Sequence, residues 1–291
     1  MNAPAPPPFA RLLLALGATG GRASVEFSAH LAELLRIPMD TLFIEDEELL
    51  GVAALPVARE ISRLGVMMPG LELGRMEREL RRQATRLERL ARHCQASGGL
   101  ESRFRVVRGR TAVELSGALR PGDCLALSRE LGPMTGPGGV GSAVQSVLTA
   151  AWSALLLMDE HLPLPASPVT TWYDGSRASE VALLLAQRLA QDSGQRLHVM
   201  LPAAGVAGRE LRLRAHRHAP GAVFSVLAPA ADTLAAIASV RGGLLVLPAP
   251  PLGLTGARLE QLLRRVRTPL LLLRMAGEHH VELAAPLAGR P

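Results

Sequence analysis

The sequence predicts an α/β fold: two doubly wound, parallel-sheet domains in tandem. Short apolar runs alternate with helical patterns along the chain, only 3% of the residues are aromatic, and one strand–turn–helix pattern occurs twice. Leu, Ala and Val packed in buried parallel strands suit this composition better than a β-sandwich does. A chain of 291 residues is long enough for two domains that each bury a core.

The repeated pattern opens each half of the chain. Arg22-Ala23-Ser24 and Arg177-Ala178-Ser179 both follow an apolar run, and both begin a stripe with helical spacing, residues 27–35 and 181–189. Each stripe leads to a short apolar run that predicts a second strand: residues 41–44 and 197–201. We infer that the chain is an internal duplication.

The ends of the two halves match as well. Gly141-Ser142 aligns with Gly256-Ala257, and the apolar runs 155–158 and 270–273 are predicted last strands that can face each other in a pseudo-dimer within the chain. The first copy is longer, and an arginine-rich helical pattern at 75–94 is interpreted as an extra helix. The predicted division is a first domain 9–158, a linker 159–168, a shorter second domain 169–275, and flexible tails 1–8 and 276–291.

Charge and cysteine content narrow the function classes. The net charge is +6 and all 32 basic residues are arginine, which excludes a Schiff-base lysine and the lysine of a GxxxxGK[ST] phosphate loop. The arginines are spread along the chain without a recognisable nucleic-acid-binding motif, so we expect solvated helix faces and no nucleic-acid partner.

Cys94 and Cys124 make neither a disulfide framework nor a zinc set, and no apolar run is long enough to span a membrane. These features predict a cytoplasmic protein without membrane insertion.

Three stretches carry a resemblance to a known family. "VTTWYDGSRASEVALLLAQRLA", from Val169, is a strand that ends in Asp174-Gly175-Ser176 before a helix. "GVGSAVQSVLTAAWSALLLM" and "LLRRVRTPLLLLR" each hold a helix and a final strand. The chain therefore resembles a tandem universal stress protein, whose domains are adenine nucleotide alpha hydrolase-like. The resemblance implies a cytoplasmic stress-response or regulatory protein that acts by binding.

The resemblance also implies where a nucleotide would bind. ATP-binding members have an aspartate at the end of the first strand and a loop of pattern Gly-x2-Gly-x9-Gly-Ser/Thr after the fourth, where the main chain must approach the phosphates closely. In the second copy Asp174 is present, but the loop reads Pro248-x2-Pro251-x4-Gly256-Ala257. Prolines have no N–H to donate, and the loop is five residues shorter than the pattern.

The first copy has the opposite defect. Its loop, Ser128-x2-Leu131-x9-Gly141-Ser142, keeps the spacing but has lost two glycines, and Thr19 or Gly17 occupies the aspartate position. The residues that remain candidates for nucleotide binding in the two copies are Thr19, Ser128, Gly138, Gly139, Gly141, Ser142 and Asp174.

Two hypotheses follow from these partial sites. In the first, the sites are degenerate and the protein acts by binding a protein partner. In the second, it is an ATP or AMP sensor that uses the glycine-rich loop of the first copy; a slow ATPase is a third, less favoured hypothesis. No cofactor is certain, no catalytic residue is identified, no metal is expected, and a homodimer stays open.

Other motifs have simpler interpretations. The stretch 19–24 resembles the Ser-Gly-Gly-x-Asp-Ser loop of ATP pyrophosphatases, but a helix cap provided by Ser24 is favoured. The acidic run 45–48 could attract Mg²⁺, but it is interpreted as the start of a helix. Asp174 is equally a functional residue or a helix cap. The histidines are expected at the surface and not in a metal site: His216, His218, His279 and His280.

Overall fold

The computed structural model describes residues 8–18, 21–54, 73–99, 101–129, 131, 144, 152–159, 168–202, 205–227, 232–254 and 256–274. The elements of the first half are β1 (Arg11–Leu16), α1 (Arg22–Leu35), β2 (Met39–Asp46), α2 (Glu47–Ala53), α3 (Leu73–Gly98), β3 (Ser102–Gly109), α4 (Thr111–Ala118), β4 (Asp123–Ser128) and β5 (Ala154–Met158). Those of the second half are β6 (Val169–Trp172), α6 (Arg177–Asp192), β7 (Leu197–Leu201), α7 (Gly205–His218), β8 (Val223–Val226), α8 (Thr233–Ala238), β9 (Leu244–Pro248), α9 (Gly256–Arg265) and β10 (Leu270–Leu273). The predicted strands at 41–44 and 197–201 are confirmed as parts of β2 and β7.

All strands belong to one ten-stranded sheet of order β3-β2-β1-β4-β5-β10-β9-β6-β7-β8. Neighbouring strands are parallel within each half. The two halves meet where β5 and β10 pair antiparallel, with Leu157 opposite Leu270 and Ala154 opposite Leu273. These are the two last strands, which the sequence predicts to face each other. The α/β fold with mostly parallel strands is confirmed.

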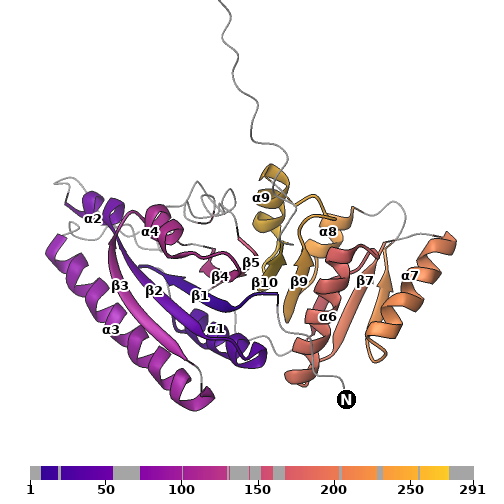
Figure 1. Ribbon diagram of the computed structural model, residues 1–291. Helices are drawn as coiled ribbons and strands as arrows, with labels where there is room; N and C mark the ends of the chain where they lie inside the picture. The colour runs from indigo at the N-terminus through magenta and orange to yellow at the C-terminus, as the bar shows by residue number, and fades with distance from the viewer. Residues whose placement is uncertain are drawn as a thin grey trace, which may run out of the picture.

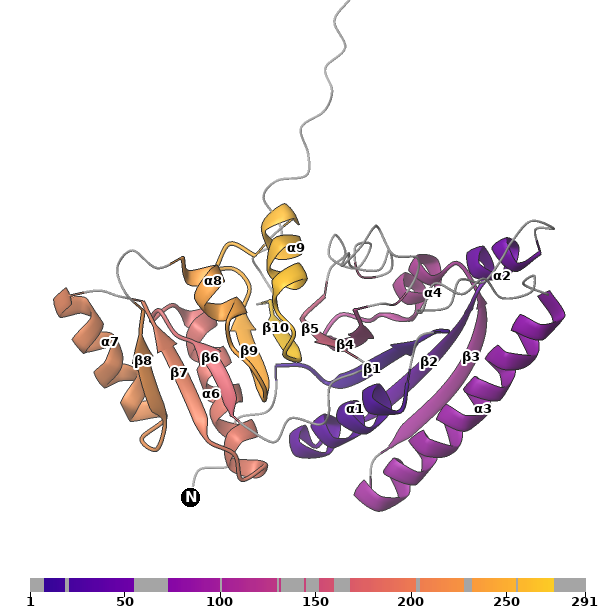
Figure 2. The same ribbon diagram turned by 180° about the vertical axis from the view of Figure 1, so that it is seen from behind.

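Helices cover both faces of the sheet. Helices α1, α3 and α6 lie on one face, and α4, α8 and α9 lie on the other (Figures 1 and 2). Every residue of β1 is buried, so its side chains divide between the two faces: Leu12 and Leu14 pack under α1, and Leu13 packs on the opposite side. From Leu12 to Leu16 the strand is apolar because neither face meets water.

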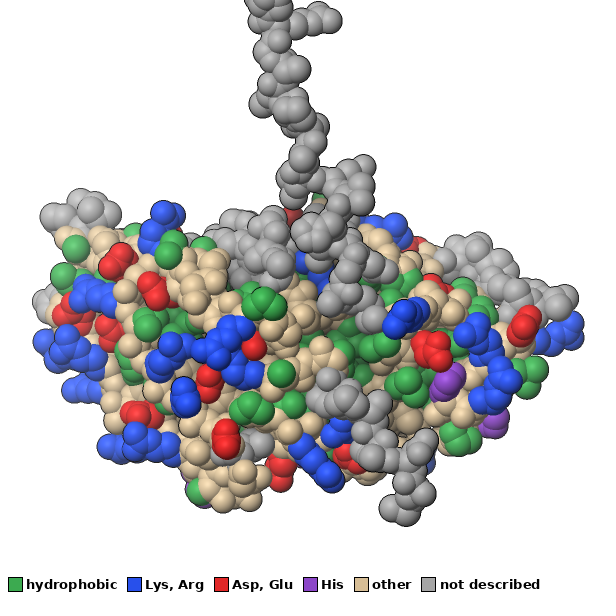
Figure 3. Space-filling model, viewed as in Figure 1, with side chains coloured by type: hydrophobic (Ala, Val, Ile, Leu, Met, Phe, Trp, Pro, Cys, Tyr) green, Lys and Arg blue, Asp and Glu red, His purple; other side chains and the backbone are tan. Residues whose placement is uncertain are grey.

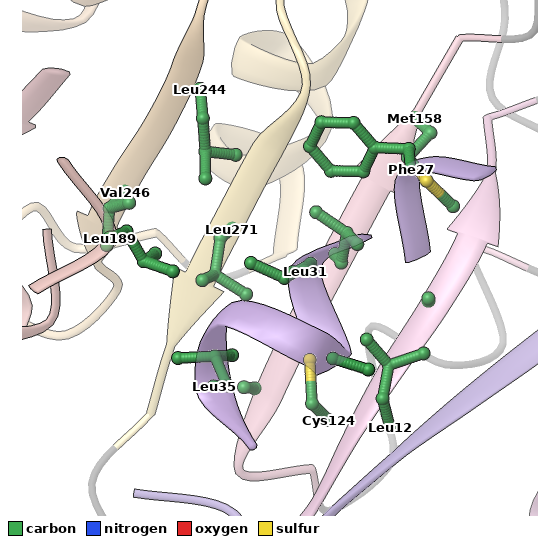
Figure 4. Packing of buried hydrophobic residues seen from close by; sticks show 14 of the residues in the cluster. Leu12, Phe27, Leu31, Leu35, Cys124, Met158, Leu189, Leu244, Val246 and Leu271 are labelled. Carbon is green, nitrogen blue, oxygen red and sulfur yellow. The ribbon is translucent and has the colours of Figure 1, made fainter. Parts of the chain in front are cut away.

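The two hydrophobic clusters are separated by the sheet and not by the midpoint of the chain. Each cluster combines residues from both halves. Figure 4 shows Leu31 and Leu35 of α1 beside Leu271 of β10, with Leu189 of α6 close by. The halves are therefore joined by side-chain packing on both faces as well as by the β5–β10 ladder. The division at 9–158 and 169–275 stays a prediction, and residues 160–167 of the expected linker lie outside the described residues.

The helix predicted at residues 75–94 is confirmed as part of α3, but its interpretation as an extra element of the first half is wrong. Helix α3 connects β2 to β3, just as α7 connects β7 to β8, so both halves have a helix at this position. The additional element of the first half, among the described residues, is the short α2. Helix α3 has 26 residues and α7 has 14. Because of this difference in length, the sequence pattern of an ordinary crossover helix resembles that of an insertion.

Candidate functional site

Asp174 lies just after the carboxyl end of β6, in a turn where it is hydrogen-bonded to Ser176 and Ser179. Its carboxylate accepts from the backbone N–H of Ser176 at 3.0 Å, and its own N–H donates to the hydroxyl of Ser179 at 3.3 Å. The Ser176 hydroxyl accepts from the N–H of Ser179 at 3.2 Å, which caps α6. The carboxylate is thus used in the turn that starts the helix, as the cap interpretation predicts.

The protonation of Asp174 reflects this turn. Burial by itself would raise the pKa of the carboxyl group, but hydrogen bonds with Ser176 and Ser179 outweigh it and lower the pKa. The group is therefore a carboxylate at neutral pH and is poorly suited to act as a general base.

The turn after Asp174 is covered by α7. Gly175 has a φ of +85°, and a Cβ on it would lie 2.5 Å from Cδ2 of Leu211. Glycine is required here because the backbone is left-handed and a helix side chain lies directly against it. Leu211 thus occupies space beside the predicted nucleotide turn.

The loop after β9 offers few amides to a phosphate. Pro248, Pro250 and Pro251 have no N–H. The N–H groups of Ala249, Gly253 and Leu254 donate within the protein, to Leu273, Pro250 and Ala249. Leu252 and Leu254 are buried in the hydrophobic cluster on this face. Among these residues the loop therefore offers few main-chain N–H groups that are not already used within the protein.

In the first half, Leu131 packs against the end of β1. A Cβ on Gly17 would lie 2.9 Å from Cδ1 of Leu131, and Leu131 is buried. The amide of Gln83, from α3, donates to the carbonyl oxygen of Ala18 at 3.1 Å. Leu131 therefore fills the space next to Gly17, one of the two positions that the resemblance aligns with the aspartate. Thr19, Gly138, Gly139, Gly141 and Ser142 lie outside the described residues.

Ser128 ends β4 and is buried. The next residue, Arg129, was not singled out from the sequence, yet its guanidinium donates to the carbonyl oxygens of Leu263 at 3.0 Å and Thr268 at 3.1 Å. Burial lowers the pKa of Arg129 to about 10. A single arginine after an apolar run carries no sequence signal of such a contact.

Ser128 and Asp174, the candidate residues that the structure describes, are not brought together. Ser128 lies at the carboxyl end of β4, which is parallel to β5, and Asp174 follows β6, which is parallel to β9 and thus to β10. β5 and β10 are antiparallel. The strands of the two halves therefore run in opposite directions, and their carboxyl ends lie at opposite ends of the sheet. The fold therefore does not bring Asp174 and Ser128 into one site.

Two further interpretations from the sequence have different outcomes. The cap role of Ser24 is wrong, because α1 begins at Arg22 and Gly21 is the N-cap, without a side-chain hydrogen bond. The acidic run does start a helix: the Asp46 carboxylate accepts from the N–H of Glu48 at 2.8 Å and from the hydroxyl of Thr111.

His218 lies 3.2 Å from a carboxylate oxygen of Glu180. Within the described ranges, no group of three or more potential ligands could hold a metal ion, and no helix could cross a membrane.

Comparisons with known proteins show what this fold resembles. No protein-family model matches the chain, and no curated protein matches it in sequence. A universal stress protein from Archaeoglobus fulgidus DSM 4304 has a TM-score of 0.56 at 15% identity, over 90% of this chain and 96% of that one. A protein of unknown function from Pseudomonas aeruginosa PAO1 has a TM-score of 0.56 at 11% identity, over 91% and 92%.

The same fold occurs in a transporter. The cytoplasmic domain of a prokaryotic cation chloride cotransporter has a TM-score of 0.51 at 14% identity, over 91% of this chain and 95% of that domain. These likenesses show an α/β protein with the universal stress protein fold across about nine-tenths of the chain. At such identities they carry no binding or catalytic property to it.

Proposed function

We propose that this protein is a cytoplasmic regulatory or stress-response protein that acts by binding a protein partner, with a degenerate nucleotide site in each half. The observation that carries the proposal is the loop after β9. Of its residues 248–254, three are prolines and three use their N–H groups within the protein. A phosphate held by main-chain amides needs several of them free and converging.

The first half supports the proposal through a different change. Leu131 fills the space against Gly17, and neither candidate for the aspartate position is a carboxylate. The chemistry on which the family resemblance relies is thus reduced in both halves. These changes favour the binding of a protein partner over the binding or turnover of a nucleotide.

An ATP or AMP sensor is the second candidate function. It is favoured by the glycines at 138, 139 and 141 and by Ser142, which preserve the end of the phosphate pattern. It needs Thr19 and Ser128 to contact the ligand without an aspartate. Asp174 does not support this candidate, because β6 runs antiparallel to β4 and the two strands therefore end at opposite ends of the sheet.

Thermal unfolding with ATP, AMP and cyclic dinucleotides distinguishes the two functions. A nucleotide at 100 times its Kd stabilises a protein by about 2.7 kcal/mol, a rise of several degrees in Tm for a chain of this size. We expect no rise at about 1 mM nucleotide, a concentration at which a site of micromolar affinity would be saturated. We also expect no nucleotide absorbance in the supernatant of denatured protein.

A saturable rise in Tm that is lost in Gly141→Pro would instead establish the sensor. Steady phosphate release that persists through further purification would establish the slow ATPase. Calorimetry with the same nucleotides checks either result without relying on unfolding.

A further inference from the structure

The outer edge of the second half is an uncharged strand. β8 is the last strand of the sheet, and within the part of the chain that the structure describes it pairs only with β7. Leu227, just after it, donates its N–H to the carbonyl oxygen of Leu201. Since successive residues direct their N–H and C=O groups to alternate sides, those of Phe224 and Val226 point away from the sheet. Val223 and Val226 are 55% and 53% exposed, so apolar side chains are exposed beside these outward backbone groups.

Helix α7 places positive charge beside this edge. It contains four arginines and one glutamate, and only Arg214 has a carboxylate within 4.0 Å among the described residues, that of Glu180. The exposed Arg212 guanidinium lies 5.9 Å from the ring centre of Phe224 in β8. Figure 3 shows arginine and histidine side chains next to exposed apolar ones at this end of the molecule.

The opposite edge of the sheet differs in kind. β3 is the other edge strand, and it carries Arg103, Arg105 and Arg108. Charged side chains on an edge strand discourage another strand from pairing with it. β8 has no such protection, although it occupies the equivalent position.

We propose that the β8 edge and α7 form a docking surface for an extended, acidic segment of another protein. The segment adds a strand to β8 through the outward groups of Phe224 and Val226, while its carboxylates pair with Arg209 and Arg212. This inference rests on the proposed function, because it names the class of partner that is bound.

The same features argue against two other occupants. A second copy would bring its own arginine-rich α7 to the surface, and like charges would oppose the contact. A nucleic acid would match the charge, but it has no backbone amides to pair with β8 and no aliphatic groups for Val223, Val226 and Leu213.

Selection from a random peptide library tests the surface without knowledge of the natural partner. The peptides are about 12 residues long, enough to span an edge strand and its flanks. Wild-type protein is used for capture, and an Arg209→Glu/Arg212→Glu variant is used for counter-selection. We expect enriched peptides with alternating acidic and β-branched residues. Fluorescence anisotropy of one enriched peptide then gives the affinities of wild type and variants, and it should show weaker binding as salt increases.

Two variants separate charge from strand pairing. Arg209→Glu/Arg212→Glu should weaken binding at least about tenfold. Val226→Pro removes an outward N–H and no hydrogen bond to β7, so it should weaken binding about tenfold and leave Tm nearly unchanged.

The matched control makes the same charge change far from β8. Arg75 and Arg89 of α3 are exposed, and the ion pairs of this helix among the described residues involve other arginines. Arg75→Glu/Arg89→Glu should therefore change the affinity less than about twofold, because only screened, long-range charge is altered.

Each result decides the proposal. Acidic consensus peptides that lose affinity in both test variants would support it. Failure to enrich any consensus, or equal binding by Val226→Pro, would overturn it. If Val226→Pro does not fold, N-methylation of alternate peptide amides tests the pairing from the other side, and unchanged affinity of every methylated peptide would overturn it.

Nucleic acid is a separate outcome of the same assay. Tighter binding of a single-stranded DNA of about the same length, insensitive to Val226→Pro, would overturn the proposal and assign the surface to backbone phosphates. Loss of this surface would leave the nucleotide experiments unaffected, so the two proposals can fail separately.

Discussion

The guanidinium of Arg129, directly after β4, donates to the carbonyl oxygen of Leu263 in the last turn of α9 at 3.0 Å. The two residues are 134 positions apart and belong to different halves of the chain. The last carbonyls of a helix have no partner within the helix and carry partial negative charge. A buried arginine that satisfies one of them therefore joins the halves beside the β5–β10 ladder.

Replacement of Arg129 by methionine should destabilise the protein. Arg129→Met leaves the carbonyl oxygens of Leu263 and Thr268 without these donors, and we expect a loss of about 1–3 kcal/mol in the free energy of unfolding. Urea unfolding measures it, with exposed Arg89→Met as the matched control. An unchanged or higher stability would mean that the cost of burying the cation exceeds the value of its hydrogen bonds.

The two halves should unfold together, because each hydrophobic cluster contains residues of both. The chain has two tryptophans, and Trp152 and Trp172 lie in different halves. In Trp172→Phe and Trp152→Phe, the remaining tryptophan reports on one half, and both fluorescence transitions should coincide with that of circular dichroism. Leu271→Ala should shift both by the same amount, at a cost of about 2–5 kcal/mol. Two separate midpoints would show that the halves are independent domains.

The sequence predicts local features of this fold better than the contacts between its parts. Apolar stripes locate α1 and α6, and the acidic run at 45–48 marks the start of α2, because these signals depend on neighbouring residues. Periodicity cannot show that α3 is the counterpart of α7, since that depends on the order of strands in the sheet. Likewise, the sequence shows Leu131 only as a departure from the family pattern that the chain resembles, and its packing against Gly17 becomes visible in three dimensions.

The packing of Leu131 against Gly17 predicts the effect of placing an aspartate at position 17. Gly17→Asp should lower the free energy of unfolding by about 1–3 kcal/mol, since its Cβ would lie 2.9 Å from Leu131 and a carboxylate would be introduced at a buried position. Leu131→Gly in the same chain should recover part of the loss, which a double-mutant cycle measures. Additive effects would indicate that the two positions do not share this space. Calorimetry with ATP on the double variant tests whether the site has been reopened.

The last prediction concerns Asp174 and pH. Its pKa is lowered from an ordinary value of 3.8 by hydrogen bonds that outweigh burial, so its contribution to stability is complete above that value and is lost as the pH falls through the folded-state pKa. Asp174→Ala should cost about 1 kcal/mol near neutral pH through loss of the turn, and the difference from wild type should shrink in acid. Asp174→Asn keeps an acceptor for the Ser176 N–H and should cost less. Urea unfolding of the three proteins from neutral pH down to about pH 2 measures this, and a difference that stays constant or grows in acid would show that the charge of Asp174 does not stabilise the turn.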